Sequence, residues 1–502
     1  MRSGKHCFRI AAFVLTVVLR LPALSLAQQV AIGAYIVNFG PNGIAVGPDG
    51  ALWFTDWRNN QIGRMTTAGA FSLYVLPNAN SSPFMITAGP DGALWFTEGA
   101  NRIGRITTAG AIAEYSVPTA NSGPQGIAKG PDGALWFAET TAKQVGRITT
   151  AGEITEFPLR HASGGPFAIT TGSDGALWFT ESGANDIGRM NADGAFAEYP
   201  VPYEGTSSLE GIAAGPDGAL WFTEYWQGTV GRITTGGVVT EYPIPNYAPE
   251  PIGIATGPDG ALWFTESYAN YIGRITTDGA ITQYPTPDTL TDSRGATPLW
   301  IAAGPDGALW FSDSGAGRIG AAYLTTAGLS VTPPKGSYRQ DLTLAGSMFA
   351  PNETVRIYAS GIGSPLLATA TADASGSFTV TARAPQAVCG PRLFLSVGDN
   401  SKLLGAASFW VTPRLILTQT SGAAGSSVVA QGFGFGSFSA VGLYWNSAST
   451  YLGTAQADIN GTFGGGSAFT ITVPEDAQPG PNEVGARGLL PKVKTKASFT
   501  VD

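Results

Sequence analysis

Cysteine and histidine are almost absent from this chain of 502 residues, which contains two of each. Cys7 lies in an N-terminal segment that we expect to be removed, so the mature chain would keep Cys389 alone. An internal disulfide and a two-cysteine metal site are therefore excluded. Charged residues are also scarce, at 13% of the chain, and acids outnumber bases, 36 to 28. The chain lacks the basic face that a nucleic-acid partner would require.

Long apolar runs are missing except at the start of the chain, from Ile10 to Leu26. This run follows a positively charged leader and is interrupted by Arg20, and Ser25 and Ala27 place small residues three and one before a cut after Ala27. The layout is typical of a cleaved secretory signal, and the run is too short and too charged for a membrane span of about 20 apolar residues. We predict a signal peptide over 1–27 and a secreted protein, extracellular or periplasmic, with no membrane span after cleavage.

What the chain has in abundance is a repeat rich in glycine and aromatic residues. The unit Gly-(Pro/Ser)-Asp-Gly-Ala-Leu-Trp-Phe occurs seven times, about 42 residues apart, with its tryptophans at Trp53, Trp95, Trp136, Trp178, Trp221, Trp263 and Trp310. Each period contains four strand-like runs. In the third copy these are Gln125–Lys129, Ala134–Glu139, Gln144–Thr149 and Glu153–Pro158. Four short strands per period of this length predict the blade of a β-propeller.

The two ends of the repeat region complement each other. The seventh copy ends after its third strand, near Thr326, and a spare strand, Val30–Val37, precedes the first copy. That strand can complete the last blade and close the ring, so we predict a seven-bladed propeller over 28–330 rather than an open solenoid. We expect Ig-like β-sandwiches over 331–412 and 413–502, because two related Gly-rich units follow Pro333-Pro334. The fold class is all-β.

An acidic residue ends the second strand of every blade. The seven acids are Asp56, Glu98, Glu139, Glu181, Glu224, Glu266 and Asp313. Because hairpin topology places all seven at one face, we expect them to form a negative funnel. A competing interpretation pairs each acid with the arginine of its third strand, the first and last of these being Arg64 and Arg274. Ala321 replaces that arginine in blade seven, which would leave Asp313 the least neutralised.

Aromatic residues gather in the loops of the same face. Those after the acids include Trp57, Tyr225, Trp226, Tyr268 and Tyr271, and those entering the inner strands include Phe84, Phe167 and Trp300. Acids ringed by aromatics suggest a bowl for a small-molecule, peptide or glycan ligand. We expect the protein to be a monomer.

The unit Pro-x-Gly-Ile-Ala-x-Gly-Pro-Asp-Gly-Ala-Leu-Trp-Phe-Thr-Glu, followed by Ile-Gly-Arg-Ile-Thr-Thr and Glu-Tyr-Pro, resembles the virginiamycin B lyase (streptogramin lyase) family from about Gln28 to Ser330. The resemblance implies a seven-bladed propeller that linearises a cyclic depsipeptide antibiotic by Mg²⁺-dependent elimination. It also implies a general-base histidine opening an inner strand, one glutamate fourteen residues after it and another two before it.

The family's histidine has no counterpart at the corresponding positions. The residues fourteen before the seven acids are Asn42, Phe84, Gln125, Phe167, Glu210, Ile252 and Leu299. Blade six keeps both acids of the family's metal spacing, Glu250 and Glu266, around Ile252. Glu210 could act as a base if burial raised its pKa, and His161, the one histidine of the expected mature chain, lies in a loop of the same face.

Three functions remain open from the sequence. The first is a ligand-binding or divergent lyase-like propeller, and the second is an active lyase that uses Glu210 or His161. The third is a non-enzymatic exported adhesion or interaction protein. The absent histidine separates the first from the second, whereas partner binding that survives loss of every acid in the ring would favour the third.

Overall fold

The computed structural model describes residues 29–502 except 38, 160–163, 203–207, 287–295, 360–361, 363, 365, 388–389, 436–438, 448, 459–460, 465–467 and 489–492. The predicted signal over 1–27, His161 and Cys389 therefore lie outside the described residues. Within them the chain is built from β-strands and turns, and no helix is long and apolar enough to cross a membrane.

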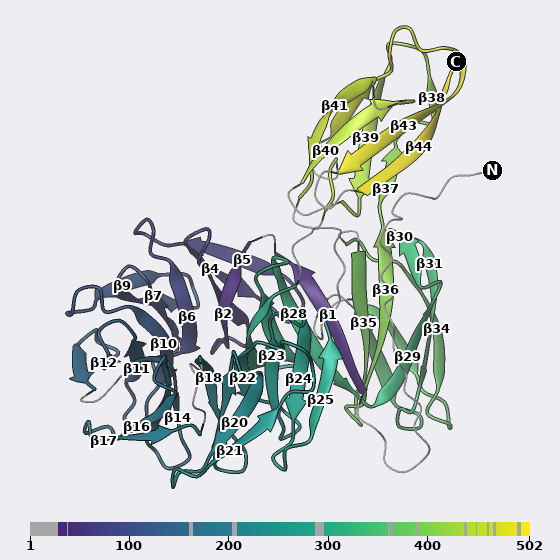
Figure 1. The fold of residues 1–502 in the computed structure, drawn as a ribbon. Coiled ribbons are helices and arrows are strands. Elements are labelled where there is room, and N and C mark those ends of the chain that lie inside the picture. The colour runs from purple at the N-terminus through teal and green to yellow at the C-terminus, as the bar shows by residue number, and fades with distance from the viewer. Residues whose placement is uncertain are drawn as a thin grey trace. The chain divides into compact units, whose positions relative to one another are not determined.

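Seven four-stranded antiparallel sheets form in the described part of the chain between Gln29 and Thr325 (Figure 1). The first blade contains β2 (Pro41–Val46), β3 (Leu52–Asp56), β4 (Gln61–Met65) and β5 (Phe71–Val75). The second contains β6 (Pro83–Ala88), β7 (Ala93–Glu98), β8 (Arg102–Thr107) and β9 (Ile112–Ser116). The third contains β10 (Pro124–Lys129), β11 (Leu135–Glu139), β12 (Gln144–Ile148) and β13 (Ile154–Pro158). The fourth contains β14 (Gly165–Thr171), β15 (Leu177–Ser182), β16 (Asp186–Met190) and β17 (Phe196–Pro200).

The remaining blades repeat this order until the ring closes. The fifth contains β18 (Leu209–Ala214), β19 (Leu220–Glu224), β20 (Thr229–Ile233) and β21 (Val239–Pro243). The sixth contains β22 (Pro251–Thr256), β23 (Leu262–Glu266), β24 (Tyr271–Ile275) and β25 (Ile281–Pro285). The seventh contains β26 (Pro298–Ala303), β27 (Leu309–Asp313) and β28 (Arg318–Thr325), and its fourth strand is β1 (Gln29–Ile36). The predicted closure by an N-terminal strand is confirmed, and the strands predicted for the third copy begin and end within one residue of those observed.

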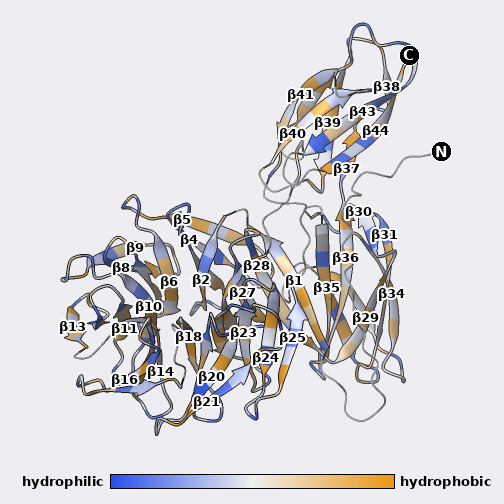
Figure 2. Cartoon of the chain, viewed as in Figure 1, coloured by the Kyte–Doolittle hydropathy of each residue, from blue (hydrophilic) through white to orange (hydrophobic). Residues whose placement is uncertain are grey.

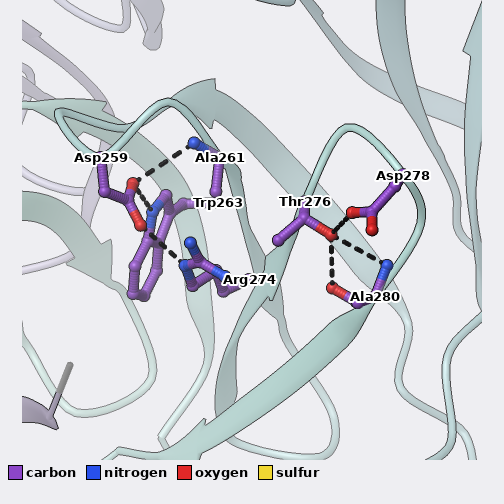
Figure 3. A network of polar contacts seen from close by, with 7 residues as sticks. All are labelled: Asp259, Ala261, Trp263, Arg274, Thr276, Asp278 and Ala280. Carbon is purple, nitrogen blue, oxygen red and sulfur yellow. Dashed lines mark hydrogen bonds and ion pairs between the residues drawn. The ribbon is translucent and has the colours of Figure 1, made fainter. Parts of the chain in front are cut away.

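The repeated Gly-(Pro/Ser)-Asp-Gly turn of each blade is held by its aspartate, as Figure 3 shows for blade six. In blade six, Oδ1 of Asp259 accepts hydrogen bonds from the indole Nε1 of Trp263 at 2.9 Å and from the backbone N–H of Ala261 at 3.4 Å. Its Oδ2 pairs with Nε of Arg274 at 2.7 Å, and that guanidinium also lies over the indole ring. Blades one to five repeat this arrangement. One turn aspartate thus fixes the first hairpin and orients the tryptophan.

The cores between blades are made from the repeated aromatics. All seven tryptophans are fully buried, and in blade three, for example, Trp136 stacks on Phe157 of the outer strand at 5.2 Å between ring centroids. The phenylalanine that follows each tryptophan, such as Phe137, lies over a third-strand glycine, here Gly146. Figure 2 shows hydrophobic residues along the blade strands. Seven equivalent packing sites explain why the motif recurs almost unchanged.

The C-terminal residues form antiparallel and mixed β-sheets around two further cores. One sheet contains β29 (Ala327–Thr332), β30 (Lys335–Ser337), β31 (Asp341–Ser347), β32 (Thr354–Tyr358), β33 (Leu366–Thr371), β34 (Phe378–Arg383), β35 (Gly390–Gly398) and β36 (Leu404–Thr412). Two smaller sheets contain β37 (Arg414–Leu417), β38 (Ser421–Gly422), β39 (Ser427–Phe433), β40 (Ala440–Trp445), β41 (Tyr451–Gln456), β42 (Phe469–Thr472), β43 (Gly480–Gly488) and β44 (Val493–Val501).

The two C-terminal units share a turn, as their sequence similarity predicts. Gly376 and Gly461 both have positive φ, and the carbonyl of each accepts a hydrogen bond from a phenylalanine amide, Phe349 or Phe435. This repeated turn supports a common origin of the two units. Their Ig-like assignment and the domain boundaries at 331 and 413 stay predictions.

Candidate functional site

Strand order brings two sets of loops to one face of the propeller. In every blade the second strand ends beside the start of the first, as in the pairing of Pro83 with Glu98. The loops that follow the second strands and those that enter the inner strands therefore share that face. A hollow of about 330 Å³ opens there, and we call it the axial pocket. Its lining residues are Asn42, Trp57, Arg58, Phe84, Phe167, Glu210, Ile252, Thr297, Leu299, Trp300, Ser314 and Gly315.

Six of the seven positions located fourteen residues before the strand-ending acids line the axial pocket; the exception among the described residues is Gln125. Each of these positions is the second residue of an inner strand, or the third in the case of Phe167, and lies at the β-bulge that shifts the register of that strand. The bulge re-aims side chains at the strand end. The propeller therefore directs one residue from each of six blades towards a common centre.

Aromatic rings form one wall of the axial pocket. Phe84 and Phe167 meet edge to face with ring centroids 6.0 Å apart, and Phe167 stacks against Trp300 at 6.4 Å. Ile252 and Leu299 add aliphatic surface. These aromatic side chains come from blades two, four and seven. The wall is therefore built by packing between blades that are far apart in the sequence.

Among the described residues that line the axial pocket, Glu210 is the one carboxylate. The hydroxyl of Ser208 donates to its Oε1 at 2.7 Å. Burial raises the pKa of Glu210, although the Ser208 hydrogen bond opposes the rise. A carboxyl group with a raised pKa is a better proton acceptor than an exposed one, and in its ionised form it can pair with a ligand cation.

The rim of the axial pocket carries a cation. Trp57 is 47% exposed, and the guanidinium carbon of Arg58 lies 5.4 Å from the centroid of its ring. Two other aromatics predicted for this face, Trp226 and Tyr268, are each 67% exposed and do not line the pocket. Of the predicted ligand-face aromatics, the structure brings together Trp57, Phe84, Phe167 and Trp300.

The expectation of a negative funnel is corrected by the structure. The strand-ending acids are at most 2% exposed, and none of them lines the axial pocket; they are Asp56, Glu98, Glu139, Glu181, Glu224, Glu266 and Asp313. Their side chains turn into the blades, beside the glycines of the third strands, as Glu139 does beside Gly146. The described lining of the pocket is therefore mainly apolar, with a single carboxylate.

The proposed arginine pairing is also wrong. The third-strand arginines of blades one to six bind the turn aspartates and not the strand-ending acids. Arginine and acid lie at opposite ends of their hairpin, because Arg147 is opposite Trp136 and Glu139 is opposite Gln144. Asp313 of blade seven was expected to be the least neutralised of the seven acids. The structure shows the reverse, because Asp313 forms a buried ion pair with Nη2 of Arg318 at 2.6 Å.

The two acids at the family's metal spacing do not form a cation site here. Glu266 accepts hydrogen bonds from Nε2 of Gln283 at 2.7 and 2.8 Å and from Nδ2 of Asn246 at 3.0 Å. The hydroxyl of Tyr225 donates to Glu250 at 2.6 Å. Both acids are thus engaged by protein donors, and the described residues contain no group of three acids, histidines or cysteines placed to hold a metal. The residues present do not fit Mg²⁺.

A second hollow, of about 420 Å³, lies on the C-terminal sheet between Arg356 and Lys402. Its principal charges, Arg356 and Asp399, pair with each other at 2.9 Å. Because these groups satisfy one another at the surface, the axial pocket is the stronger candidate site.

Together, the ring of seven blades and a pocket at the centre of one face define a β-propeller whose candidate binding site is shared between blades. The virginiamycin B lyase family model matches residues 31–208 and 161–332, and the chain belongs to that family. The curated virginiamycin B lyase of Bordetella bronchiseptica is 51% identical over 41 residues, and this match spans only 14% of its length.

Solved structures agree with this assignment. A streptogramin B lyase is 36% identical, with a TM-score of 0.56, covering 60% of this chain and all of the other. A catalytically inactive histidine-to-alanine variant of virginiamycin B lyase from Staphylococcus aureus, in a structure with quinupristin, is 39% identical, with a TM-score of 0.55 and coverage of 59% and 100%. The extracellular domain of a putative hybrid two component system from B. thetaiotaomicron, at 11% identity and a TM-score of 0.50, shares the fold alone over 76% of this chain.

Several residues of the axial pocket escaped sequence reasoning. Arg58, Thr297 and Ser314 line it but belong to no aromatic or acidic pattern. Asn42, Ile252 and Leu299 were found by spacing but were considered only as replacements for a base. The regular distance of fourteen residues was the signal that could have predicted half of the lining, six of its twelve residues.

Proposed function

We propose that the propeller is a lyase-like binding protein whose axial pocket holds a small or peptide ligand with an apolar, aromatic part. The observation that supports this proposal is the composition of the pocket. The rings of Phe84, Phe167 and Trp300 offer a stacking surface, and Glu210 offers an acceptor for one ligand N–H or O–H group. Pockets with apolar walls and a few placed polar groups are typical of ligand sites.

Binding without turnover is favoured over the family's metal-dependent elimination. Glu250 and Glu266 are occupied by Tyr225, Gln283 and Asn246, and Ile252 stands where the family places its base. An aliphatic side chain cannot remove a proton, whereas it can bury ligand surface. We further propose that the protein is exported, from the predicted signal at 1–27.

Quinupristin, which accompanies the related enzyme of Staphylococcus aureus in its structure, is the probe that tests this proposal. We expect the full mature chain to bind quinupristin in calorimetry with unchanged affinity in EDTA, and to leave it uncleaved in chromatography with or without Mg²⁺. Phe167→Ala, which removes the ring that joins Phe84 to Trp300, should weaken binding about tenfold or more, in line with the loss of a buried aromatic contact.

Trp226→Ala provides the matched control, because Trp226 is exposed and lies outside the pocket lining; its affinity should stay within about twofold of wild type. Two results would refute the proposal: cleavage of quinupristin that is lost on chelation, or equal affinities for wild type and Phe167→Ala. Absence of any binding by the folded wild-type chain would also count against it.

A metal-independent lyase is the second candidate, and the environment of Glu210 is the specific observation in its favour. With its pKa raised by burial, Glu210 could take the proton next to a substrate carbonyl while the ester C–O bond breaks and a carboxylate leaves. Cleavage in EDTA by wild type that disappears in Glu210→Gln would establish this activity. Cleavage unaffected by that substitution would exclude Glu210 as the base.

A further inference from the structure

Four blades contain a second, half-buried acid next to the fully buried one that ends their second strand. It lies on the outer strand, in a Glu-Phe-Pro or Glu-Tyr-Pro motif in blades three to five and in Glu-Tyr-Ser in blade two. The pairs, which we call the carboxyl pairs, are Glu98 with Glu114, Glu139 with Glu156, Glu181 with Glu198, and Glu224 with Glu241. They occupy equivalent positions in blades two to five and line no part of the axial pocket.

The third-strand glycine allows the two carboxyl groups to meet. In blade three, Gly146 is opposite Phe137 on one side and Glu156 on the other, so all three point to the same face of the sheet. Glu139, two residues after Phe137, points to that face as well. A Cβ on Gly146 would lie 2.7 Å from Oε1 of Glu139. The two acids therefore reach towards each other over a gap in the middle strand, and no side chain separates them.

The carboxyl pairs have few other donors. Glu181 is fully buried, and both of its carboxyl oxygens lack a hydrogen-bond partner among the described residues. The residue opposite it on β16 is a third acid, Asp186. Two fully ionised carboxylates buried side by side would cost several kcal/mol, so such an arrangement requires a shared proton or a bound cation.

The other blades show what the same position requires when the second acid is missing. In blade six the outer-strand residue is Gln283, whose Nε2 donates to both oxygens of Glu266. In blade one, Asp56 receives hydrogen bonds from Gln61 and Asn59, at 2.8 and 2.9 Å. In blade seven, Asp313 receives them from Arg318. In each case a donor satisfies the buried acid.

A protonated glutamic acid is nearly isosteric with glutamine and supplies the same kind of donor. We propose that each carboxyl pair retains one proton between its two acids, and that these four shared protons make the propeller a fold that is more stable in weak acid than above neutral pH. In this arrangement the protons replace the amide of Gln283.

The groups that face the pairs differ between blades. Arg102 faces Glu98, Gln144 donates to Glu139, Asp186 faces Glu181, and Thr229 faces Glu224. From the loop of the preceding blade, Asn78 donates to Glu114 and Thr119 donates to Glu156. In blades three, four and five, burial raises the pKa of the strand-ending acid and the charge of the second acid raises it further; in blade four Asp186 adds to this effect.

Burial, reinforced by the second acid, raises the pKa of Glu98 and Glu139 to about 7 and that of Glu181 and Glu224 to about 8. The unfolded chain loses these protons near pH 4.5, whereas the folded chain holds them until pH 7 to 8. Over that window the folded state binds more protons, so stability falls as pH rises and levels off above it.

The test is thermal unfolding of the full mature chain from pH 5 to pH 9 in EDTA. We expect the midpoint of wild type to fall by about 5 °C or more across this range. The fourfold variant E114Q/E156Q/E198Q/E241Q, which installs the native blade-six residue in every pair, should lose most of this dependence. A wild-type midpoint that does not fall, or an equal fall in the fourfold variant, would overturn the proposal.

Single variants keep the test decisive if the fourfold variant fails to fold. Glu198→Gln should reduce the fall in midpoint by about a quarter, and Gln283→Glu, which creates a fifth pair, should increase it by about the same amount. Calcium chloride added at pH 8 distinguishes a proton from a cation. A midpoint raised by calcium in wild type more than in Glu198→Gln would assign the pairs to a cation and overturn the proposal.

Discussion

Carboxyl groups in this propeller make its stability depend on pH in two opposite directions. The hydrogen-bond donors around each group decide which direction applies. Partial burial disfavours the charged form of a turn aspartate such as Asp132, but hydrogen bonds from Trp136 and Arg147 outweigh it and hold the pKa of Asp132 below its usual value. The stabilisation from such an aspartate is present above pH 4 and is lost as pH falls through the lowered pKa. The carboxyl pairs have the opposite dependence, because the stabilisation that their shared protons provide is lost as pH rises. We therefore expect the propeller to be most stable between about pH 4 and pH 5, with stability falling on either side of that range.

Asp132→Ala tests the role of the turn aspartate. It removes the acceptor for Trp136 Nε1 at 3.0 Å and for Ala134 N–H at 3.2 Å, and the partner of Arg147 at 2.6 Å. Since the indole N–H is then left buried and unsatisfied, the free energy of unfolding should fall by about 1–3 kcal/mol. Denaturant unfolding measures this. Asp132→Asn keeps an acceptor oxygen, so its free energy of unfolding should fall by less than that of Asp132→Ala. An equal fall in the two variants would contradict the assigned role of the hydrogen bonds.

At the scale of the strand, the third-strand glycine is the element that permits both aromatic packing and the carboxyl pairs. A Cβ on Gly146 would lie 2.1 Å from Cζ of Phe137, a ring that is fully buried. The ring of Phe137 cannot move away without disrupting the packing between two blades. Glycine at this position is therefore required by packing, since its φ is an ordinary strand value.

Gly146→Ala should lower the free energy of unfolding by about 1–3 kcal/mol, the usual cost of overpacking a buried site. Gly236→Ala is the matched control, because the nearest atom to its added Cβ is Oγ1 of Thr234 at 3.8 Å; its stability should stay within about 0.5 kcal/mol of wild type. Urea unfolding of both variants gives the comparison. Similar stability for the two would show that the glycine is dispensable.

At the scale of the whole propeller, closure depends on a strand from the start of the chain. The hydroxyl of Thr325 in β28 donates to the carbonyl of Gln29 in β1 at 3.2 Å, and Tyr35 stacks on Trp310 at 5.4 Å. Without β1, the last blade would have three strands and the edge of β28 would be open to pairing with other chains.

A chain that begins at Val37 should therefore unfold about 10 °C or more below a chain that begins at Gln28, and it should aggregate more readily. Scanning calorimetry and light scattering give the two readouts. Matching midpoints for the two chains would mean that β1 adds little to the stability of the ring.

The repeat alone determined the fold of this protein, because seven copies of one blade with a spare strand at the start have few ways to bury their aromatics other than a closed ring. It also located the axial positions, since Asn42, Phe84, Phe167, Glu210, Ile252 and Leu299 followed from a spacing of fourteen residues. The tertiary structure alone decided which way the acids face and what they bind. That outcome depends on side-chain direction and on neighbours distant in sequence, such as Gln283 for Glu266, which a strand pattern does not encode.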